Sequence, residues 1–455
     1  MKKVLWFFCA LLIKTSSLSA QERKKLDFEG FTEKADRYVK SIENIGEFRG
    51  TILVAKGNEI KFHKGYGIAS ERFEIPNSEN TKFRVGSVTK SFTAISILQL
   101  IEKGKLSLED PVSKFLPKYS FADKIKIKHL LSHTSGIKRD IKFPEQNKEY
   151  PLKELIKLSE VDSLLYKPGS KMTYSNCGYI LLQYILEKQS GSKYEDYVTK
   201  NVLNPLGLFN TGIEHPKTPP KRLADGFGSG VDKNGHYAIV ETPMLAHGYP
   251  IGVGAMYSTT EDLMKFSRQI GKSKILSKES WDLALKPFIK NKGYEWGFGF
   301  NIIKSKTFTA FNHNGRTTGF RCGYFYFKED DLTIIILGNY NNASREEIVK
   351  AFRRILLKIK YKQPEPLVAK VTTSRELKEY LGDYKTEGFP FKILEFENNI
   401  YVQSHGDAPV IIKKYDNDAF FCKYFDLRLK FKREEGKIIG CDWNFKETTM
   451  PARKI

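Results

Sequence analysis

The stretch FRVGSVTKSFTAISILQLIEKGKL (Phe83–Leu106) predicts a long helix with a distinctive pair of polar residues at its start. Its apolar residues recur at helical spacing, which favours an amphipathic helix that ends near Lys103 and Gly104. The buried side of this helix would carry Phe92, Ala94, Ile95, Leu98 and Ile101. Ser87 and Lys90 stand three residues apart, so they would share one face of the first turn.

A serine and a lysine in this arrangement suit nucleophilic catalysis. A serine hydroxyl attacks poorly until a base removes its proton, and lysine serves as that base only as the neutral amine. Burial or neighbouring positive charge lowers the pKa of lysine enough to allow this. Backbone N–H groups at a helix start also favour the negative charge that develops during attack. Ser87 is therefore a candidate nucleophile and Lys90 its candidate base.

The Ser-x-x-Lys pattern alone is weak, because it occurs three times, at Ser87, Ser135 and Ser190. Only Ser87 opens a long helical pattern. Ser135 lies in the loop sequence HTSGIKRD, and Ser190 lies in a turn rich in serine and glycine. The context of the pattern, rather than the pattern itself, singles out the first copy.

Strand patterns flank the Ser87 helix on both sides. A helical segment, LDFEGFTEKADRYVKSIENIG, and a hairpin around the turn pair Gly57-Asn58 precede it. The runs KTFTAFNHNG, GFRCGYFYFKEDD and LTIIILGNY predict antiparallel neighbours, followed by a helix with Ser344 as its N-cap. Between these ends, to about Ile302, we expect helix and loop, with helices at Leu152–Leu164, Tyr179–Gln189 and Glu261–Ile270. The order predicts an α/β (α+β) unit with an antiparallel sheet built from both ends, flanked by helices, and a helical lobe.

A linker and a small β-rich unit are expected after residue 362. The segment KYKQPEPLVAKVTTS contains two prolines, so residues 363–373 are interpreted as a linker. Short alternating strands broken by Gly, Asn and Asp fill residues 374–455 and predict a small all-β sheet or barrel. Cys422 and Cys441 fall in neighbouring strand patterns, and a disulfide between them stays an open alternative.

Two further motifs place polar side chains beside helix or strand ends. YKPGSKMTYSNCGYILLQYILEK puts Tyr174 and Asn176 in a turn just before another amphipathic helix. FNHNGRTTGF puts His313, Asn314 and Gly315 at the end of a strand. Each short pattern also recurs elsewhere in the chain, so neither identifies a site when taken singly.

Taken in order, Ser-x-x-Lys, Tyr-x-Asn and His-x-Gly resemble the three active-site elements of the serine β-lactamase and penicillin-binding-protein superfamily, in its class C-like branch. The similarity covers roughly residues 30 to 360 and includes GKLSLEDPVSKFLP (Gly104–Pro117), IKIKHLLSHTSGI (Ile125–Ile137), NPLGLFNTG (Asn204–Gly212) and GVGAMYSTTEDLMKF (Gly252–Phe266). It implies a β-lactamase/transpeptidase-like fold for residues 21–362, followed by a small β module at 374–455. It also implies that His129 and His133 are structural residues rather than metal ligands.

The resemblance implies a catalytic role for three residues. Ser87 would be the nucleophile that forms an acyl-enzyme, and Lys90 would be its base or proton relay. Tyr174 would exchange protons with the attacking serine, the leaving group and the deacylating water.

Four more residues would bind the substrate. Asn176 would hydrogen-bond Lys90 or the substrate amide, and His313 and Gly315 would line the strand along which the substrate lies. The backbone N–H groups of Ser87 and Arg316 would form the oxyanion hole.

The third motif departs from that of the lactamases in this branch, which carry Lys-Thr-Gly where this chain has His313-Asn314-Gly315. Neutral imidazole attracts a β-lactam carboxylate less than an ammonium group does. His-x-Gly is familiar among the esterases and D-amino-acid peptidases of the superfamily. Arg316 restores a positive charge nearby, so a carboxylate-bearing substrate stays an alternative.

The first 20 residues, MKKVLWFFCALLIKTSSLSA, have the pattern of a secretory signal peptide. A basic start precedes the apolar run Val4–Ile13, and Ser19-Ala20 supplies small residues for cleavage. Lys14 ends the run too early for a transmembrane helix, which needs about 20 apolar residues. We expect an exported protein, periplasmic or secreted, with no transmembrane segment after cleavage.

The formal net charge of +22 raises nucleic-acid binding as an alternative. The lysines are spread along the whole chain instead of forming one stripe, and export argues against that partner. The eight histidines are dispersed without metal-ligand spacing, so we expect neither a metal nor another cofactor.

The sequence therefore predicts an exported serine hydrolase that acts through an acyl-enzyme on amides or esters. The substrate would be a small molecule or peptide: an ester, a D-amino-acid amide, a peptidoglycan stem peptide or a β-lactam. An esterase or D-aminopeptidase/carboxypeptidase-like activity ranks above a true β-lactamase. The alternative is a penicillin-binding-like sensor or cell-wall-binding protein with little or no turnover.

Overall fold

The structure is a computed structural model that describes residues 24–145, 148–215, 218–242, 250–291, 294–341, 343–364, 368–404, 408–422, 427–445 and 448–455. The expected signal peptide lies outside the described residues, and the expected linker lies partly outside them. Among the described residues, no helix combines the length and the apolar character needed to cross a membrane.

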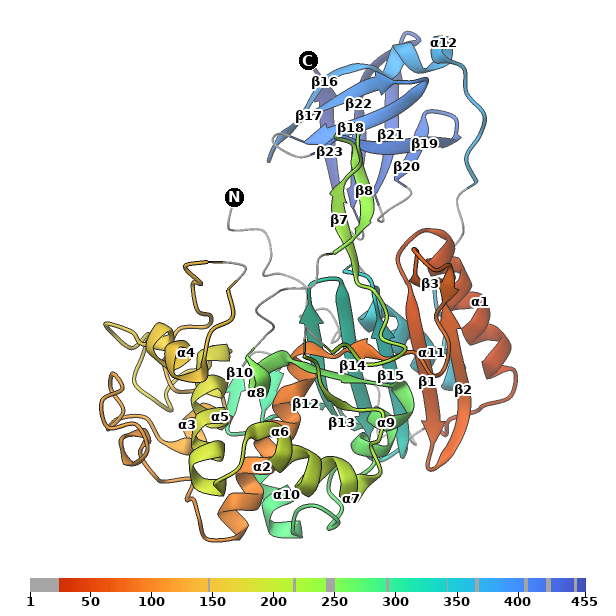
Figure 1. The fold of residues 1–455 in the computed structure, drawn as a ribbon. Helices are drawn as coiled ribbons and strands as arrows, with labels where there is room; N and C mark the ends of the chain where they lie inside the picture. The colour runs from red at the N-terminus through yellow and green to blue at the C-terminus, as the bar shows by residue number, and fades with distance from the viewer. Residues whose placement is uncertain are drawn as a thin grey trace.

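An antiparallel sheet of eight strands runs through the larger part of the chain (Figure 1), with the order β10-β11-β12-β13-β14-β15-β1-β2. Its strands are β1 (Gly50–Lys56), β2 (Glu59–Tyr66), β10 (Ile289–Asn291), β11 (Tyr294–Trp296), β12 (Asn301–Lys304), β13 (Thr309–Thr317), β14 (Phe320–Phe327) and β15 (Leu332–Gly338). Strand β1 pairs with β15 from Gly50↔Gly338 to Lys56↔Leu332. The early hairpin and the three late strands therefore join in one sheet, as the strand patterns predict.

One face of the sheet is covered by α1 (Phe31–Asn44) and α11 (Arg345–Leu356), the helices from the two ends of this unit. Phe31 and Phe352 meet edge to face, with ring centroids 5.5 Å apart, and Phe62 of β2 joins them. Ser344 occupies the N-cap position of α11, but its hydroxyl donates to Glu47 and caps no helix N–H. The predicted position of the N-cap is confirmed, but the expected hydrogen bond from a helix N–H to the Ser344 side chain is not formed.

Helix α2 (Thr89–Glu102) lies against the other face and is buried all round, which corrects the predicted amphipathic helix. Every side chain from Thr89 to Leu100 is buried, because α2 packs against α5, α6 and α8 as well as the sheet. Its small hydroxyls bond carbonyls of other segments: Ser91 Oγ donates to the carbonyl of Gly299 at 2.8 Å, and Thr93 Oγ1 donates to that of Gly252 at 2.7 Å. In the sequence these serine and threonine residues look like the solvent-exposed face of an amphipathic helix, although their side chains are buried.

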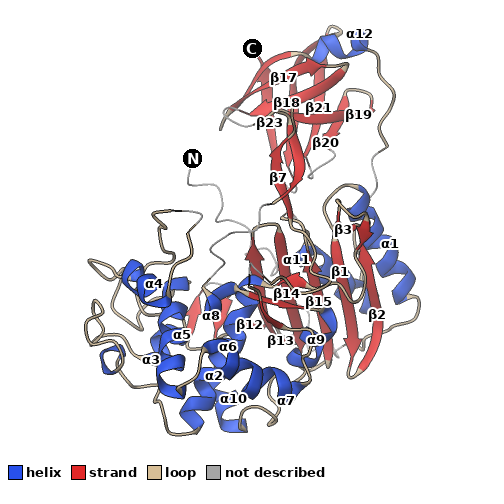
Figure 2. Cartoon of the chain, in the orientation of Figure 1, coloured by secondary structure: helices blue, strands red, loops and turns tan. Residues whose placement is uncertain are grey.

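The helical lobe beyond α2 contains α3 (Ile127–Leu131), α4 (Leu152–Ser159), α5 (Asn176–Ser190), α6 (Tyr194–Val198), α7 (Asn204–Leu206), α8 (Ile251–Gly254), α9 (Thr260–Ser267) and α10 (Lys278–Ala284). Figure 2 shows these helices gathered on one side of the sheet. Helix α4 ends five residues before the predicted Leu164, because Glu160 adopts extended backbone. Short strands β3 (Ile68–Ser70), β4 (Ile75–Pro76), β5 (Phe83–Arg84), β6 (Gly212–Ile213) and β9 (Met256–Ser258) connect the lobe to the sheet.

A hairpin that the sequence patterns missed, β7 (Phe227–Val231) and β8 (Tyr237–Glu241), projects from the sheet toward the C-terminal unit (Figure 1). The Tyr237 N–H donates to the carbonyl of Pro409 at 2.7 Å. The ring of His236 stacks on Tyr401 with centroids 4.4 Å apart. This hairpin therefore ties the larger unit to the C-terminal one.

The C-terminal residues form a closed barrel, which confirms the predicted all-β unit. After α12 (Ser374–Leu377) its strands are β16 (Gly382–Thr386), β17 (Pro390–Phe396), β18 (Asn399–Ser404), β19 (Val410–Asp416), β20 (Ala419–Cys422), β21 (Leu427–Glu434), β22 (Lys437–Phe445) and β23 (Thr448–Lys454). Strand β16 pairs with β23, so the strand order closes on itself. Aromatic side chains such as Tyr384, Phe391 and Phe431 fill the interior.

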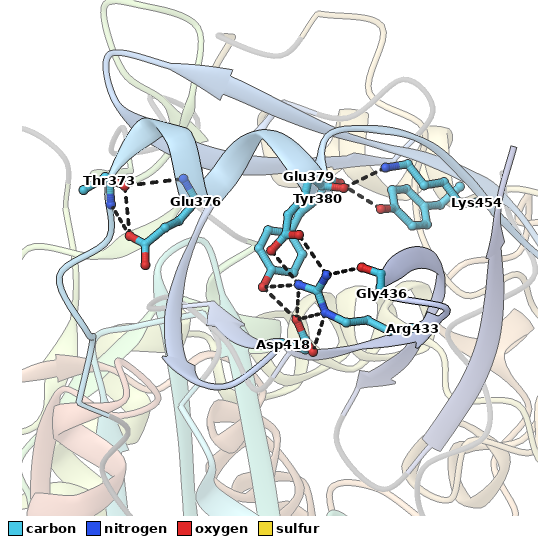
Figure 3. A network of polar contacts seen from close by, with 9 residues as sticks. Thr373, Glu376, Glu379, Tyr380, Asp418, Arg433, Gly436 and Lys454 are labelled. Carbon is cyan, nitrogen blue, oxygen red and sulfur yellow. Dashed lines mark hydrogen bonds and ion pairs between the residues drawn. The ribbon is translucent and has the colours of Figure 1, made fainter.

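A polar network fixes the turn after α12 to the barrel strands (Figure 3). Arg433 donates to Glu379 at 2.5 Å and to Asp418 at 2.8 Å, and Tyr380 donates to the same Asp418 at 2.7 Å. The guanidinium holds the pKa values of Glu379 and Asp418 below their ordinary range. The network is satisfied within the protein, so it serves the barrel's architecture.

The disulfide alternative is wrong, because Cys422 and Cys441 are both buried and form no disulfide with each other. Strand β21 separates them, with Cys441 facing Phe431 and Phe421 facing Arg428 on its two sides. The two cysteines therefore lie on β20 and β22, which are second neighbours in the barrel and not adjacent strands.

Candidate functional site

Ser87 lies in a single 3-10 turn, Gly86–Val88, that leads directly into α2. The Val85 N–H donates to the carbonyl of Met256 at 2.9 Å, and Thr89 Oγ1 donates to the carbonyl of Gly86 at 2.7 Å. The turn is thus held on both sides, which fixes the Ser87 side chain at the start of a buried helix.

Two glycines allow this turn to lie directly against β13. A Cβ on Gly315 would stand 1.9 Å from the carbonyl oxygen of Val85, closer than any side chain tolerates. Gly86 has φ +51°, and a Cβ there would lie 2.9 Å from the carbonyl oxygen of Arg316. Close backbone approach therefore explains the glycine of the third motif.

Lys90 places its amine beside the Ser87 hydroxyl. Its Nζ lies 3.1 Å from Ser87 Oγ and donates to the carbonyl of Val253 at 2.8 Å. The side chain is fully buried, and this burial lowers the pKa of Lys90 well below its ordinary value. The charge of Asp140 opposes that shift and the charge of Arg139 adds to it. A neutral Lys90 amine that donates to Val253 keeps its lone pair for the Ser87 proton.

Tyr174 precedes α5 and lies close to the same pair. Its ring centroid is 5.1 Å from Lys90 Nζ, and its hydroxyl is buried without a hydrogen-bond partner among the described residues. Burial raises the pKa of Tyr174, and the nearby Ser87 hydroxyl partly offsets that rise. The two hydroxyls are thus neighbours that form no hydrogen bond of ordinary geometry.

Asn176 sits at the rim of this group. Its side-chain amide donates to Asp140, and its backbone N–H donates to the carbonyl of Arg139 at 2.7 Å. The Oδ1 atom is buried and has no partner among the described residues. The Oδ1 atom of Asn176 can therefore accept a hydrogen bond from a ligand, whereas its side-chain NH2 group already donates to Asp140.

His313 is buried on β13, with Nδ1 2.8 Å from the carbonyl oxygen of Asn314. A carbonyl only accepts, so Nδ1 carries the single proton of the neutral ring and Nε2 is a bare acceptor. Burial, followed by the charge of Lys90, lowers the pKa of His313 to about 3. His313 Nε2 has no partner among the described residues, so it too can meet a ligand.

The exposed backbone edge of β13 faces the Ser87 turn. Strand β12 pairs with β13 only as far as Asn312, whereas β14 pairs with it to Thr317 across a two-residue turn. Alternation of bonded and non-bonded pairs from that turn directs the Arg316 N–H away from β14 and toward Gly86. The Arg316 side chain itself is exposed.

The structure adds two aromatic residues that sequence reasoning missed as site components. His133 has its ring centroid 4.2 Å from that of Tyr174, and Trp296 lies 5.8 Å from Tyr174 and 5.5 Å from His313. The segment HTSG draws attention to His133, but its resemblance to a connecting segment implies only a structural role for this residue. No local pattern marks Trp296. The described residues contain no group of three potential metal ligands.

Comparison with known proteins matches this chain to the "Beta-lactamase" family over residues 36–357. Penicillin-binding protein 4* of Bacillus subtilis (strain 168) is 27% identical over 415 residues, which span 86% of this chain and 92% of the relative. Among solved structures, an octameric penicillin-binding protein homologue from Pyrococcus abyssi has a TM-score of 0.64 at 24% identity and covers 92% of this chain and 99% of its own.

A D-amino acid amidase from Ochrobactrum anthropi SV3 shares the fold, with a TM-score of 0.62 at 20% identity over 72% of this chain and 98% of that chain. The two structural matches support the fold. The family match spans the sheet, α2 and the residues gathered around Ser87. On this match, the chain belongs to the β-lactamase family.

Proposed function

We propose that this protein is an exported serine hydrolase that cleaves amide or ester bonds through an acyl-enzyme on Ser87. The observation that carries the proposal is the 3.1 Å contact between Ser87 Oγ and the buried amine of Lys90, whose pKa is well lowered. A hydroxyl beside a neutral amine is an activated nucleophile. Export rests on the N-terminal signal pattern, and we propose residues 21–362 as the hydrolase domain and 374–455 as a separate β domain.

The geometry supports a complete reaction cycle. Lys90 accepts the Ser87 proton as the oxygen attacks the carbonyl carbon, and the backbone N–H groups of Ser87 and Arg316 stabilise the resulting oxyanion. Tyr174 relays a proton to the departing amine or alcohol, which leaves the acyl group on Ser87. Water then attacks the acyl carbon and gives its proton back through Tyr174 and Lys90, which releases the acid and restores the Ser87 hydroxyl.

The substrate preference follows from His313. Because Nδ1 donates to Asn314, the Nε2 lone pair faces the site and repels a carboxylate, whereas a substrate N–H or O–H group would bond it. This supports an esterase or D-aminopeptidase-like activity above a carboxypeptidase-like activity or a true β-lactamase, because the substrates of the last two carry a carboxylate. The fold shared with a D-amino acid amidase is compatible with that ranking.

A penicillin-binding-like protein with little turnover is the second candidate, favoured by the name of the Bacillus subtilis relative. The two functions are distinguished by incubating the protein with p-nitrophenyl butyrate, a D-alanine p-nitroanilide and the β-lactam nitrocefin. Continuous product release from the ester or the anilide supports the hydrolase. A single burst equal to the enzyme concentration supports the slow acylated form, and no release from any donor contradicts both.

A Gly315→Ala variant is expected to lose at least about 100-fold in kcat/KM, because its Cβ would push the Ser87 turn away from β13. The assay is p-nitrophenyl butyrate hydrolysis, with melting temperature measured in parallel. Gly388→Ala is the matched control, since a Cβ there meets only Thr386 Oγ1 at 3.9 Å. Full activity in Gly315→Ala would contradict the close packing of turn and strand.

A further inference from the structure

Both backbone amides that flank Tyr174 are tied to one residue, His133. The Thr173 N–H donates to the His133 carbonyl at 3.0 Å, and the Ser175 N–H donates to His133 Nδ1 at 3.1 Å. The backbone of His133 has φ +60°, a left-handed conformation that non-glycine residues adopt at some cost.

The His133 ring also contacts the Tyr174 ring itself. Their centroids lie 4.2 Å apart with planes inclined by 30°, so the contact is close and nearly parallel. Tyr179, at 5.0 Å, and the edge contact with Trp296, at 5.3 Å, hold the imidazole in turn. His133 thus fixes the chain before Tyr174, the chain after it and the plane of its ring.

This clamp depends on a neutral imidazole. Nδ1 accepts from Ser175, so the ring proton sits on Nε2, and protonation of Nδ1 would break that bond. Burial lowers the pKa of His133 well below its ordinary value, and positive charge on Lys90, His313 or Arg139 would lower it further. The carboxylate of Asp140 counteracts the lowering of the Lys90 pKa, and it accepts a hydrogen bond from the Asn176 side chain. A cation at His133 would face Lys90 across Tyr174.

We propose that His133 is a positioning residue that holds the Tyr174 hydroxyl against Ser87 and Lys90. The inference rests on the proposed function, because it assigns no chemistry to His133 itself. It predicts that His133 affects the reaction only through Tyr174. A double-mutant cycle tests such a dependence directly.

His133→Phe keeps an aromatic ring but removes the Nδ1 acceptor. We expect kcat for p-nitrophenyl butyrate to fall about tenfold to a hundredfold with little change in KM, since small displacements of a catalytic group have costs of that size. In a Tyr174→Phe background the same substitution is expected to change the acylation rate less than about threefold. Acylation followed by intact mass gives the rate where turnover is too slow to measure.

His133→Asn is the second variant, because its side-chain oxygen can replace Nδ1 as the acceptor from Ser175. It is expected to recover part of the loss, and melting temperatures report whether each variant folds. His129→Phe is the matched control from the same segment, because His129 Nδ1 accepts from the Lys126 N–H and lies at the start of α3. Its effect, if any, is expected on stability and not on the cycle.

Equal losses for His133→Phe in the wild-type and Tyr174→Phe backgrounds would overturn the inference, as would failure of both His133 variants to fold. If Ser87→Ala keeps wild-type activity, the proposed function fails first. If Ser87→Ala is inactive and the cycle shows no coupling, only the role of His133 fails.

Discussion

A Ser87→Ala variant is expected to hydrolyse p-nitrophenyl butyrate about 10⁴-fold more slowly than the wild-type protein, with an unchanged melting temperature. The substitution removes the oxygen that carries the acyl group in the proposed mechanism, while the turn and α2 keep their backbone bonds. Steady-state kinetics at neutral pH measure the loss.

Ser190→Ala is the matched control for this loss. Ser190 starts another Ser-x-x-Lys pattern, but it lies at the end of α5, where its hydroxyl bonds the neighbouring carbonyl of Ser192. Wild-type activity is expected for it. Comparable losses in both serine variants, or substantial activity in Ser87→Ala, would refute the assignment of the nucleophile.

A Lys90→Met variant is expected to lose about 10³-fold or more in acylation rate, because no other base lies within hydrogen-bond distance of Ser87 Oγ among the described residues. Methionine fills nearly the same volume without a basic nitrogen. The measurement is the pre-steady-state release of p-nitrophenol together with the circular dichroism spectrum of the folded protein. A folded Lys90→Met variant with normal acylation would contradict the role of the lysine.

The same variant is expected to reveal the protonation of Lys90 through the pH dependence of stability. Burial lowers the folded-state pKa of Lys90 well below its unfolded value of 10.5, so between these two values the unfolded chain binds one more proton. Stability then rises with pH, by about 1.4 kcal/mol per unit within that window, in wild type relative to Lys90→Met. The gain ends as pH reaches the unfolded-state pKa.

Urea unfolding of both proteins between pH 8 and pH 10 measures this slope. Lys188→Met is the control, because Lys188 also donates to a carbonyl, that of Phe115, yet its side chain is exposed. A flat difference between wild type and Lys90→Met across the range would show that the folded protein keeps Lys90 charged.

Much of the fold was readable from local patterns, and its departures have physical causes. The apolar run in LTIIILGNY and the turn Gly57-Asn58 identify strands directly, and the structure joins them as β15 and β1–β2. The amphipathic pattern of α2 gives a wrong prediction of its exposure, because its buried hydroxyls bond carbonyls that are distant in sequence, such as that of Gly299. The sequence patterns miss the β7–β8 hairpin, because it is held in part by contacts with the distant barrel, as between His236 and Tyr401.

The candidate site shows the same division. Ser87, Lys90, Tyr174 and His313 could be placed from motif order, and the structure brings them to one location. The carbonyl of Val253 could not be placed in this way, because every residue has a carbonyl and only the fold determines which one accepts from Lys90. The roles of backbone groups and of aromatic neighbours in a site cannot be recognised from residue type alone.

The most direct measurement is the location of the acyl group after brief reaction with p-nitrophenyl butyrate, acid quenching and peptide mass mapping. The expected result is one butyryl group on the peptide that contains Ser87, absent from Ser87→Ala. An adduct on another residue, retained in Ser87→Ala, or hydrolysis without any adduct in a rapid quench would contradict an acyl-enzyme at this serine.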